Sequence, residues 1–124
     1  IEKAAEGALL NLSHAGFAPR SQTCTIDARH ILQRHEPGSF DAIITNPPFG
    51  VRIGSKMNFF GFYTSLLPEF HSALTESGRL TILTDRKSTF DQASERFGGF
   101  ELRSQTRVQM GGVDPWIISL QKAA

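Results

Sequence analysis

The feature that most restricts the fold is an apolar run that stops abruptly at two consecutive prolines. Residues 40–45 read Phe-Asp-Ala-Ile-Ile-Thr, and residues 46–50 continue Asn-Pro-Pro-Phe-Gly. The apolar residues follow one another without alternation, which is typical of a strand buried on both faces of a parallel sheet. Proline has no backbone N–H to donate, so the strand is expected to end at the asparagine. The run therefore predicts a strand within a helix-covered sheet.

The rest of the chain alternates helical and extended patterns, as an α/β domain does. Apolar residues recur at helical spacing near the N-terminus and again from residue 59, where Gly78 is the expected stop. Pro68 lies inside the second pattern and predicts a kink or a later start. In chain order we expect a helix over 2–15, a strand over 23–26, a helical turn over 28–35, a strand over 40–45, a helix between 59 and 78, a strand over 80–84, a helix over 90–97, and strands over 100–109 and 116–120.

Composition bounds the class of protein. The 124 residues are enough for one domain. The 13 basic and 12 acidic side chains nearly cancel, so the chain has no overall positive charge that would attract nucleic acid or a membrane. The single cysteine, Cys24, cannot form an intramolecular disulfide, which favours a reduced, cytoplasmic setting. Cysteine and histidine show no metal-binding spacing, and we expect neither a metal ion nor a membrane segment.

An aspartate that opens a buried strand ending in Asn-Pro-Pro-aromatic resembles the catalytic motif of S-adenosylmethionine-dependent methyltransferases that act on planar amino nitrogens. The wider pattern over residues 45–54 and 66–83 and at Gly111-Gly112 resembles the RNA guanine-N2 methyltransferases, which usually accompany a THUMP RNA-binding domain. The resemblance implies a Rossmann-like class I methyltransferase sheet, S-adenosyl-L-methionine as cofactor, and guanine N2 of tRNA or rRNA as the methyl acceptor.

The motif residues suit methylation of an exocyclic amine. The side-chain oxygen of Asn46 and the carbonyl of Pro47 can accept hydrogen bonds from an NH2 group. Positive charge grows on the nitrogen as the methyl group arrives, so fixed acceptors stabilise the transition state more than the ground state. Pro48 stiffens the loop, and Phe49 offers a face on which a flipped base can stack. An Asn-Pro turn with Phe49 in the core is the simpler alternative, which the preceding strand disfavours.

Asp27 and Ala28 resemble the end of the third strand in this superfamily, where an aspartate accepts a hydrogen bond from the adenine amine of the cofactor. The resemblance therefore assigns Asp27, Ala28 and Asn46 to cofactor binding. Asp27 could instead cap the helical turn that follows it. Its position about twenty residues before Asn46 favours the cofactor.

Basic residues near the expected strand ends are candidates for binding RNA phosphates. Arg52, Arg86 and Lys87 follow expected strands and are assigned to the substrate RNA together with Phe49. Lys56, Arg103 and Arg107 are further candidates for the same role. For Arg103 and Arg107 a solvated charged surface is the preferred interpretation.

The sequence departs from the family pattern at its beginning. The glycine-rich first loop is absent, because Gly98-Gly99 and Gly111-Gly112 come too late. We therefore expect a single partial catalytic domain, residues 1–124, without the first two strands and first helix. The strand over 23–26 then lacks a neighbour. Three outcomes are open: the chain is a piece of a longer protein, for example one with an upstream THUMP-type domain, the strand pairs with 40–45, or two copies exchange strands in a homodimer.

Other functions share these features. Adenine N6 in DNA or RNA presents the same kind of amine, and a glutamine side-chain amide is a third planar nitrogen. A non-catalytic RNA-binding or assembly module is an alternative from another class. The missing glycine loop favours that module, whereas the intact motif at residues 46–49 disfavours it.

Overall fold

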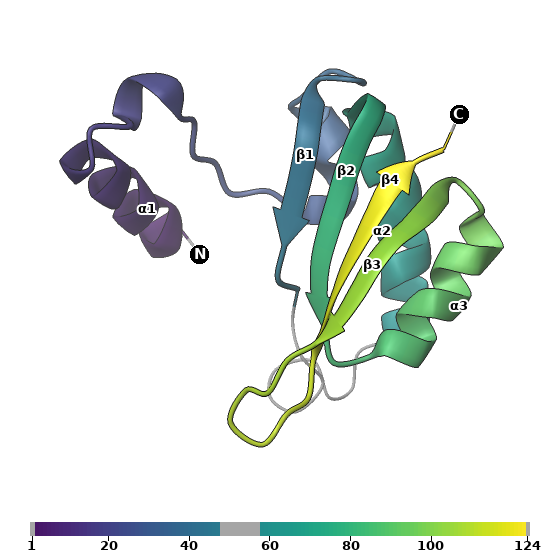
Figure 1. Cartoon of the computed structure of the whole chain (residues 1–124). Coiled ribbons are helices and arrows are strands. Elements are labelled where there is room, and N and C mark those ends of the chain that lie inside the picture. The colour runs from purple at the N-terminus through teal and green to yellow at the C-terminus, as the bar shows by residue number, and fades with distance from the viewer. Residues whose placement is uncertain (1, 48–57, 124) are drawn as a thin grey trace.

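A computed structural model describes residues 2–47 and 58–123. Their order along the chain is helix, two short 3-10 helices, strand, helix, strand, helix and a final pair of strands (Figure 1). The elements are α1 (Glu2–His14), η1 (Ala18–Arg20), η2 (Ala28–Gln33), β1 (Phe40–Thr45), α2 (Phe59–Ala73), β2 (Leu74–Thr84), α3 (Lys87–Phe97), β3 (Phe100–Arg107) and β4 (Trp116–Lys122).

The four strands form one mixed sheet in the order β1-β2-β4-β3. β1 and β2 are parallel, and α2 connects them, as expected for a parallel pair. β4 lies between β2 and β3 and is antiparallel to both. The expected α/β class is confirmed, although only one of the three strand pairs is parallel.

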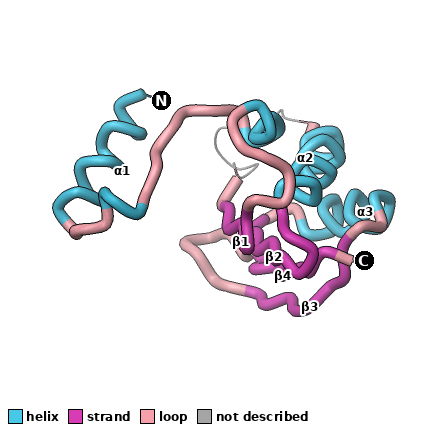
Figure 2. Tube along the Cα trace, turned by 90° about the horizontal axis from the view of Figure 1, so that it is seen from above, coloured by secondary structure: helices cyan, strands magenta, loops and turns pink. Residues whose placement is uncertain are grey.

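Helices α2 and α3 cover one face of this sheet (Figure 2). The apolar stripe of α2 packs onto inward-facing residues of β2 and β4, and Phe90 of α3 completes the core. The core side chains of these elements are Phe59, Tyr63, Leu66, Leu67, Phe70, Leu74, Leu80, Ile82, Phe90, Ala93, Ile118 and Leu120.

The opposite face of the sheet carries exposed apolar side chains. Ile44 is 82% exposed, and Ile117 is 40% exposed. The prediction that residues 40–45 and 80–84 are buried on both faces is therefore wrong for the described residues. Helices lie on one face only, so alternate residues of β1 and β2 have no cover. The continuous apolar run is real, but the second layer that it implies is not supplied by residues 2–47 and 58–123.

The predicted strand over 23–26 does not form. Residues 21–27 are extended but pair with no strand in the described part of the chain. A strand is stable only when its backbone N–H and C=O groups find partners, and β1 remains the edge of the sheet. Of the outcomes considered for this segment, pairing beside β1 is thus excluded in this structure.

Helix α1 stands apart from the sheet (Figures 1 and 2). Its predicted extent is confirmed to within one residue, and Gly16 with φ of 80° ends it as expected. Its apolar stripe is not buried, since Leu9 is 47% exposed and Ala4 and Ala8 are also exposed. Among the described residues, α1 contacts chiefly the adjacent η1.

Three further boundaries differ from expectation. β2 begins at Leu74, directly after α2, rather than at residue 80. α2 begins at Phe59, continues through Pro68 and ends at Ala73, so Gly78 is not its stop. Gly78 instead lies within β2, where an added Cβ would approach the Leu74 Cβ to 2.8 Å. Glycine is thus required at this position because any side chain would clash with Leu74. α3 starts at Lys87 rather than residue 90, and the Gly98 stop with φ of 74° is confirmed.

Candidate functional site

The carboxyl ends of β1 and β2 lie side by side because the two strands are parallel neighbours (Figure 1). Thr45 pairs with Ile82, so the register brings Asn46 and Pro47 alongside the last residues of β2. In open α/β sheets, ligands bind beyond such carboxyl ends. The motif predicted from sequence therefore begins where a ligand site is expected.

Asn46 and Pro47 differ in burial. Pro47 is buried, whereas Asn46 is exposed and lines a shallow apolar depression of about 330 Å³ with Ile44, Leu83 and Ile117 among its walls. The asparagine amide is thus accessible to a ligand, and the proline anchors the backbone next to it. Pro48, Phe49, Arg52 and Lys56 lie outside the described residues.

A buried hydrogen-bond chain fixes the end of β2. The hydroxyls of Tyr63 and Thr84 lie 2.6 Å apart, and the backbone N–H of Arg86 donates to the Thr84 hydroxyl at 3.0 Å. Burial raises the pKa of Tyr63, the Thr84 hydrogen bond opposes this, and the charge of Asp85 adds to the rise. The neutral phenol therefore persists well into alkaline solution and holds this turn in place.

Asp85 is a polar residue at this edge that the sequence analysis missed. It directly follows β2, and its Oδ1 atom is buried with no hydrogen-bond partner among the described residues. A sequence signal was available, since an aspartate immediately after a buried strand is a candidate ligand residue in any open α/β sheet.

Arg86 and Lys87 lie at the same edge, as predicted. The Arg86 guanidinium stacks over the Phe59 ring at 4.9 Å. Lys87 pairs with Asp91 at 2.5 Å and lies over the Trp116 ring at 5.3 Å. Both cations are thus held against aromatic rings at the start of α3.

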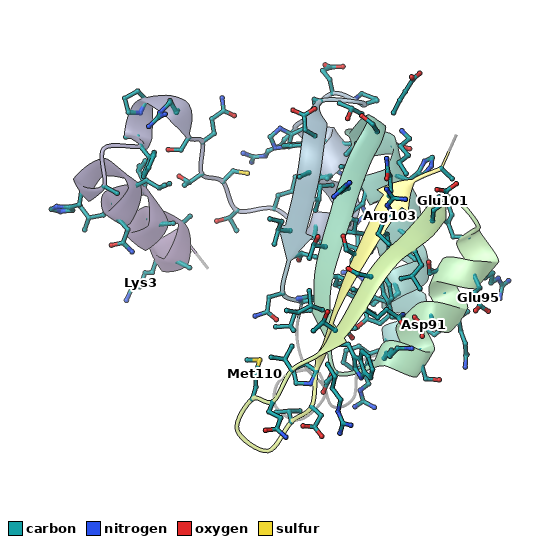
Figure 3. All side chains as sticks on the ribbon, viewed as in Figure 1. Lys3, Asp91, Glu95, Glu101, Arg103 and Met110 are labelled. Carbon is teal, nitrogen blue, oxygen red and sulfur yellow. The ribbon has the colours of Figure 1, made fainter. Side chains whose placement is uncertain are left out.

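Arg103 and Arg107 have different surroundings. Arg107 pairs with Asp114 across the β3–β4 hairpin at 2.5 Å. Arg103 lies on β3 near Glu101, away from the hairpin end marked by Met110 (Figure 3). The preference for a solvated surface at these two positions agrees with their exposure.

Asp27 caps η2, as the simpler interpretation proposed. It accepts a hydrogen bond from the Arg29 backbone N–H at 2.9 Å and is also paired with the Arg29 side chain. These hydrogen bonds, led by the side-chain one, hold the pKa of the Asp27 carboxyl well below its usual range. The Arg29 guanidinium lies 5.8 Å from the Phe62 ring, which places the start of η2 beside the first turns of α2. An exposed, ionised acceptor at this position fits a ligand amine.

No metal centre or membrane helix is evident in the described ranges. His, Cys, Asp and Glu side chains of residues 2–47 and 58–123 form no group of three or more suited to a metal ion. Within the same ranges, every helix is too short or too polar to cross a bilayer.

The parallel β1–β2 pair, its connecting helix and the antiparallel β3–β4 pair match part of the fold of S-adenosylmethionine-dependent class I methyltransferases, and the Asn-Pro motif lies at the carboxyl edge of β1 and β2. Residues 1–115 match the profile of the RMKL-like methyltransferase domain. The chain belongs to that family.

Two similar sequences carry the name tRNA (guanine(6)-N2)-methyltransferase. The one from Thermus thermophilus is 38% identical over 96 residues, which are 77% of this chain and 28% of the relative. The one from Archaeoglobus fulgidus is 32% identical over 107 residues, which are 86% of this chain and 26% of the relative. The chain therefore spans little more than a quarter of the curated relatives that it matches.

Solved structures agree with this assignment. TrmN from Thermus thermophilus superposes with a TM-score of 0.84 and 29% identity over 99% of this chain and 34% of that one. A possible methylase from Clostridium difficile superposes with a TM-score of 0.71 and 21% identity over 99% of this chain and 30% of that one. The second similarity supports the fold alone.

Proposed function

We propose that this chain forms the substrate-binding part of a methyltransferase catalytic domain that methylates N2 of guanine in tRNA. The observation that carries the proposal is the accessible Asn46 amide beside the buried Pro47, at the joint carboxyl edge of β1 and β2. The names of the similar sequences support guanine N2 and tRNA as the acceptor.

In this proposal the Asn46 side-chain oxygen and the Pro47 carbonyl accept hydrogen bonds from the two protons of the guanine 2-amine. S-adenosyl-L-methionine, when bound, supplies an electrophilic methyl group. The amine lone pair would accept this methyl group, with S-adenosylhomocysteine as the leaving group, and one amine proton would then leave to solvent. The two acceptors stabilise the positive charge that grows on the amine nitrogen, so no further base is required. Pro48 would stiffen the loop, and Phe49 would stack on the base.

Asp27, Ala28 and Asn46 are the proposed cofactor contacts. The Asp27 carboxylate is exposed, ionised and fixed by Arg29, which suits acceptance of a hydrogen bond from an adenine amine. Calorimetric titration of S-adenosylhomocysteine into the whole protein tests this role. Asp27→Ala is expected to weaken binding about tenfold, whereas loss of the exposed Asp114 carboxylate, remote in sequence on the hairpin, is expected to leave it unchanged.

RNA is the proposed partner, held by Arg86 and Lys87 at the start of α3 and by Arg52. Because a lysine and an arginine beside aromatic rings can bind phosphates and stack on bases, this edge suits single-stranded or flipped nucleotides. The balanced net charge of +1 favours an additional targeting domain, such as an upstream THUMP-type module. A tRNA substrate implies a cytoplasmic location.

The experiment is methylation of tRNA by the whole protein with labelled S-adenosylmethionine, followed by mass spectrometry of the nucleosides. N2-methylguanosine is the expected product. N6-methyladenosine would instead support the adenine alternative, and RNA binding without any methylation would support the non-catalytic module.

A further inference from the structure

Among the described residues at the site edge, Asp85 carries a carboxylate to which the proposed chemistry gives no role. Its Oδ1 atom is buried and has no hydrogen-bond partner among the described residues. Buried carboxylate oxygens are costly to leave unpaired, and such exceptions commonly mark functional positions. Asp85 therefore calls for a specific partner that binds at this edge.

The fold fixes Asp85 from both sides. Thr84 before it is buried and bonded to Tyr63 at 2.6 Å, and the backbone N–H of Arg86 after it donates to the same Thr84 hydroxyl at 3.0 Å. The charge of Asp85 contributes to the raised pKa of Tyr63, in agreement with their proximity. A carboxylate on so constrained a turn is positioned before any ligand binds.

Neighbouring cations are engaged elsewhere. Arg86 stacks over Phe59 at 4.9 Å, and Lys87 pairs with Asp91 at 2.5 Å. Within the described residues Asp85 makes no ion pair, and α3 has no side-chain hydrogen bond at its N-cap. Neither charge pairing nor helix capping thus accounts for an aspartate here.

The sheet brings Asp85 next to the amine-binding residues. β1 and β2 are parallel neighbours about 4.8 Å apart, and the Thr45–Ile82 pairing carries Pro47 alongside Thr84. Asp85 is therefore the first residue beyond β2 at the edge where Asn46 and Pro47 leave β1.

We propose that Asp85 selects guanine by accepting a hydrogen bond from its N1–H, while Asn46 and Pro47 hold the adjacent 2-amine. This inference rests on the proposed function. Guanine presents N1–H and N2–H donors side by side, whereas adenine presents an acceptor at N1 beside its amine. A carboxylate group accepts hydrogen bonds but donates none, so it favours guanine and repels adenine N1.

The test replaces the target guanine of a tRNA transcript with 2-aminopurine, which keeps the 2-amine but has an acceptor at N1. The wild-type protein is expected to methylate guanine with a kcat/KM about 10- to 100-fold above that for 2-aminopurine. Asp85→Asn can donate its amide N–H to the purine N1, so the ratio is expected to fall at least about tenfold or to invert. Asp41→Asn, at the exposed far end of β1, is the matched control and keeps the wild-type ratio.

The outcomes distinguish the role proposed for Asp85 from the proposed function on which it rests. The ratio compares two substrates on one protein, so a loss of folded protein in Asp85→Asn cancels from it. A wild-type ratio in Asp85→Asn, with guanine still methylated, would overturn the role of Asp85 and leave the proposed function standing. Absence of guanine N2 methylation by the wild-type protein would overturn both.

Discussion

The two ends of this chain differ in how their apolar residues are used. Residues 58–123 bury a continuous core between α2, α3 and the sheet, with Leu67 and Ile82 fully inaccessible. Residues 2–27 form a well-defined helix and an extended segment, yet leave Leu9 and Leu10 exposed. Helical spacing of apolar residues therefore predicts a helix in both regions but burial in only one. Burial depends on whether a partner surface is present.

Hydrogen exchange gives the largest expected contrast between the regions. Backbone amides of residues 21–27 have no strand partner, so in the 124-residue chain they are expected to exchange orders of magnitude faster than the amide of Ile82 in β2. Mass spectrometry of peptides after deuterium labelling measures the difference. Equal protection would mean that residues 21–27 pair with another strand, for instance in an exchanged dimer.

Matched leucine substitutions sharpen the same comparison. Leu67→Ala removes a fully buried side chain and is expected to lower the free energy of unfolding by about 3 kcal/mol. Leu10→Ala removes an exposed one in α1 and is expected to change it by less than about 0.5 kcal/mol. Urea unfolding measures both. Comparable losses would show that α1 is packed in solution.

The Tyr63–Thr84 hydrogen bond is expected to contribute less than the apolar core. Tyr63→Phe is predicted to cost about 1–2 kcal/mol, because the Thr84 hydroxyl loses one partner but keeps Arg86. The raised pKa of Tyr63 stabilises the folded state below pH 10, and this contribution is lost as pH rises from 10 through the folded-state pKa.

Tyr63 is the sole tyrosine, so its phenolate absorbance reports this titration directly. A midpoint at or below 10 would contradict its burial. Thr84→Ser keeps a hydroxyl at the same position and serves as the control for loss of the hydrogen bond.

The smallest expected effect concerns His71, which lies edge-on to Phe97 and Phe100. Burial lowers its pKa, as does the charge of Lys122, although a backbone hydrogen bond with Gly99 opposes them. The unfolded state then binds more protons, so stability falls as pH drops below about 6.5. His71→Gln is expected to reduce this dependence in urea titrations between pH 5 and 7.5.

Sequence periodicity predicted most of the elements correctly, because local patterns determine them. Helix α1, β1 and the C-terminal pair of strands appear near their expected bounds. The strand predicted over 23–26 does not form, because a strand also needs a neighbour, which local sequence does not reveal. The prediction that β1 is buried on both faces is wrong for the same reason, since burial requires a second helical layer and Ile44 is exposed.

The candidate site was predicted in part. The position of Asn46 and Pro47 followed from a strand that must end before proline, and the register with β2 agrees with it. Asp85 was missed although it directly follows a predicted strand, which is a usable sequence signal. Its buried oxygen and the adjacent Tyr63–Thr84 contact, which joins residues far apart in sequence, are visible only in three dimensions.

The most direct test of the account is the single-turnover rate of tRNA methylation by the whole protein with Asn46→Ala. Loss of one preorganised acceptor at the reacting amine is expected to slow methyl transfer about 100- to 1000-fold without weakening tRNA binding. Asn11→Ala, on the exposed surface of α1, is the matched control and is expected to react at the wild-type rate. A rate near wild type for Asn46→Ala would contradict the assignment of the site to the carboxyl edge of β1 and β2.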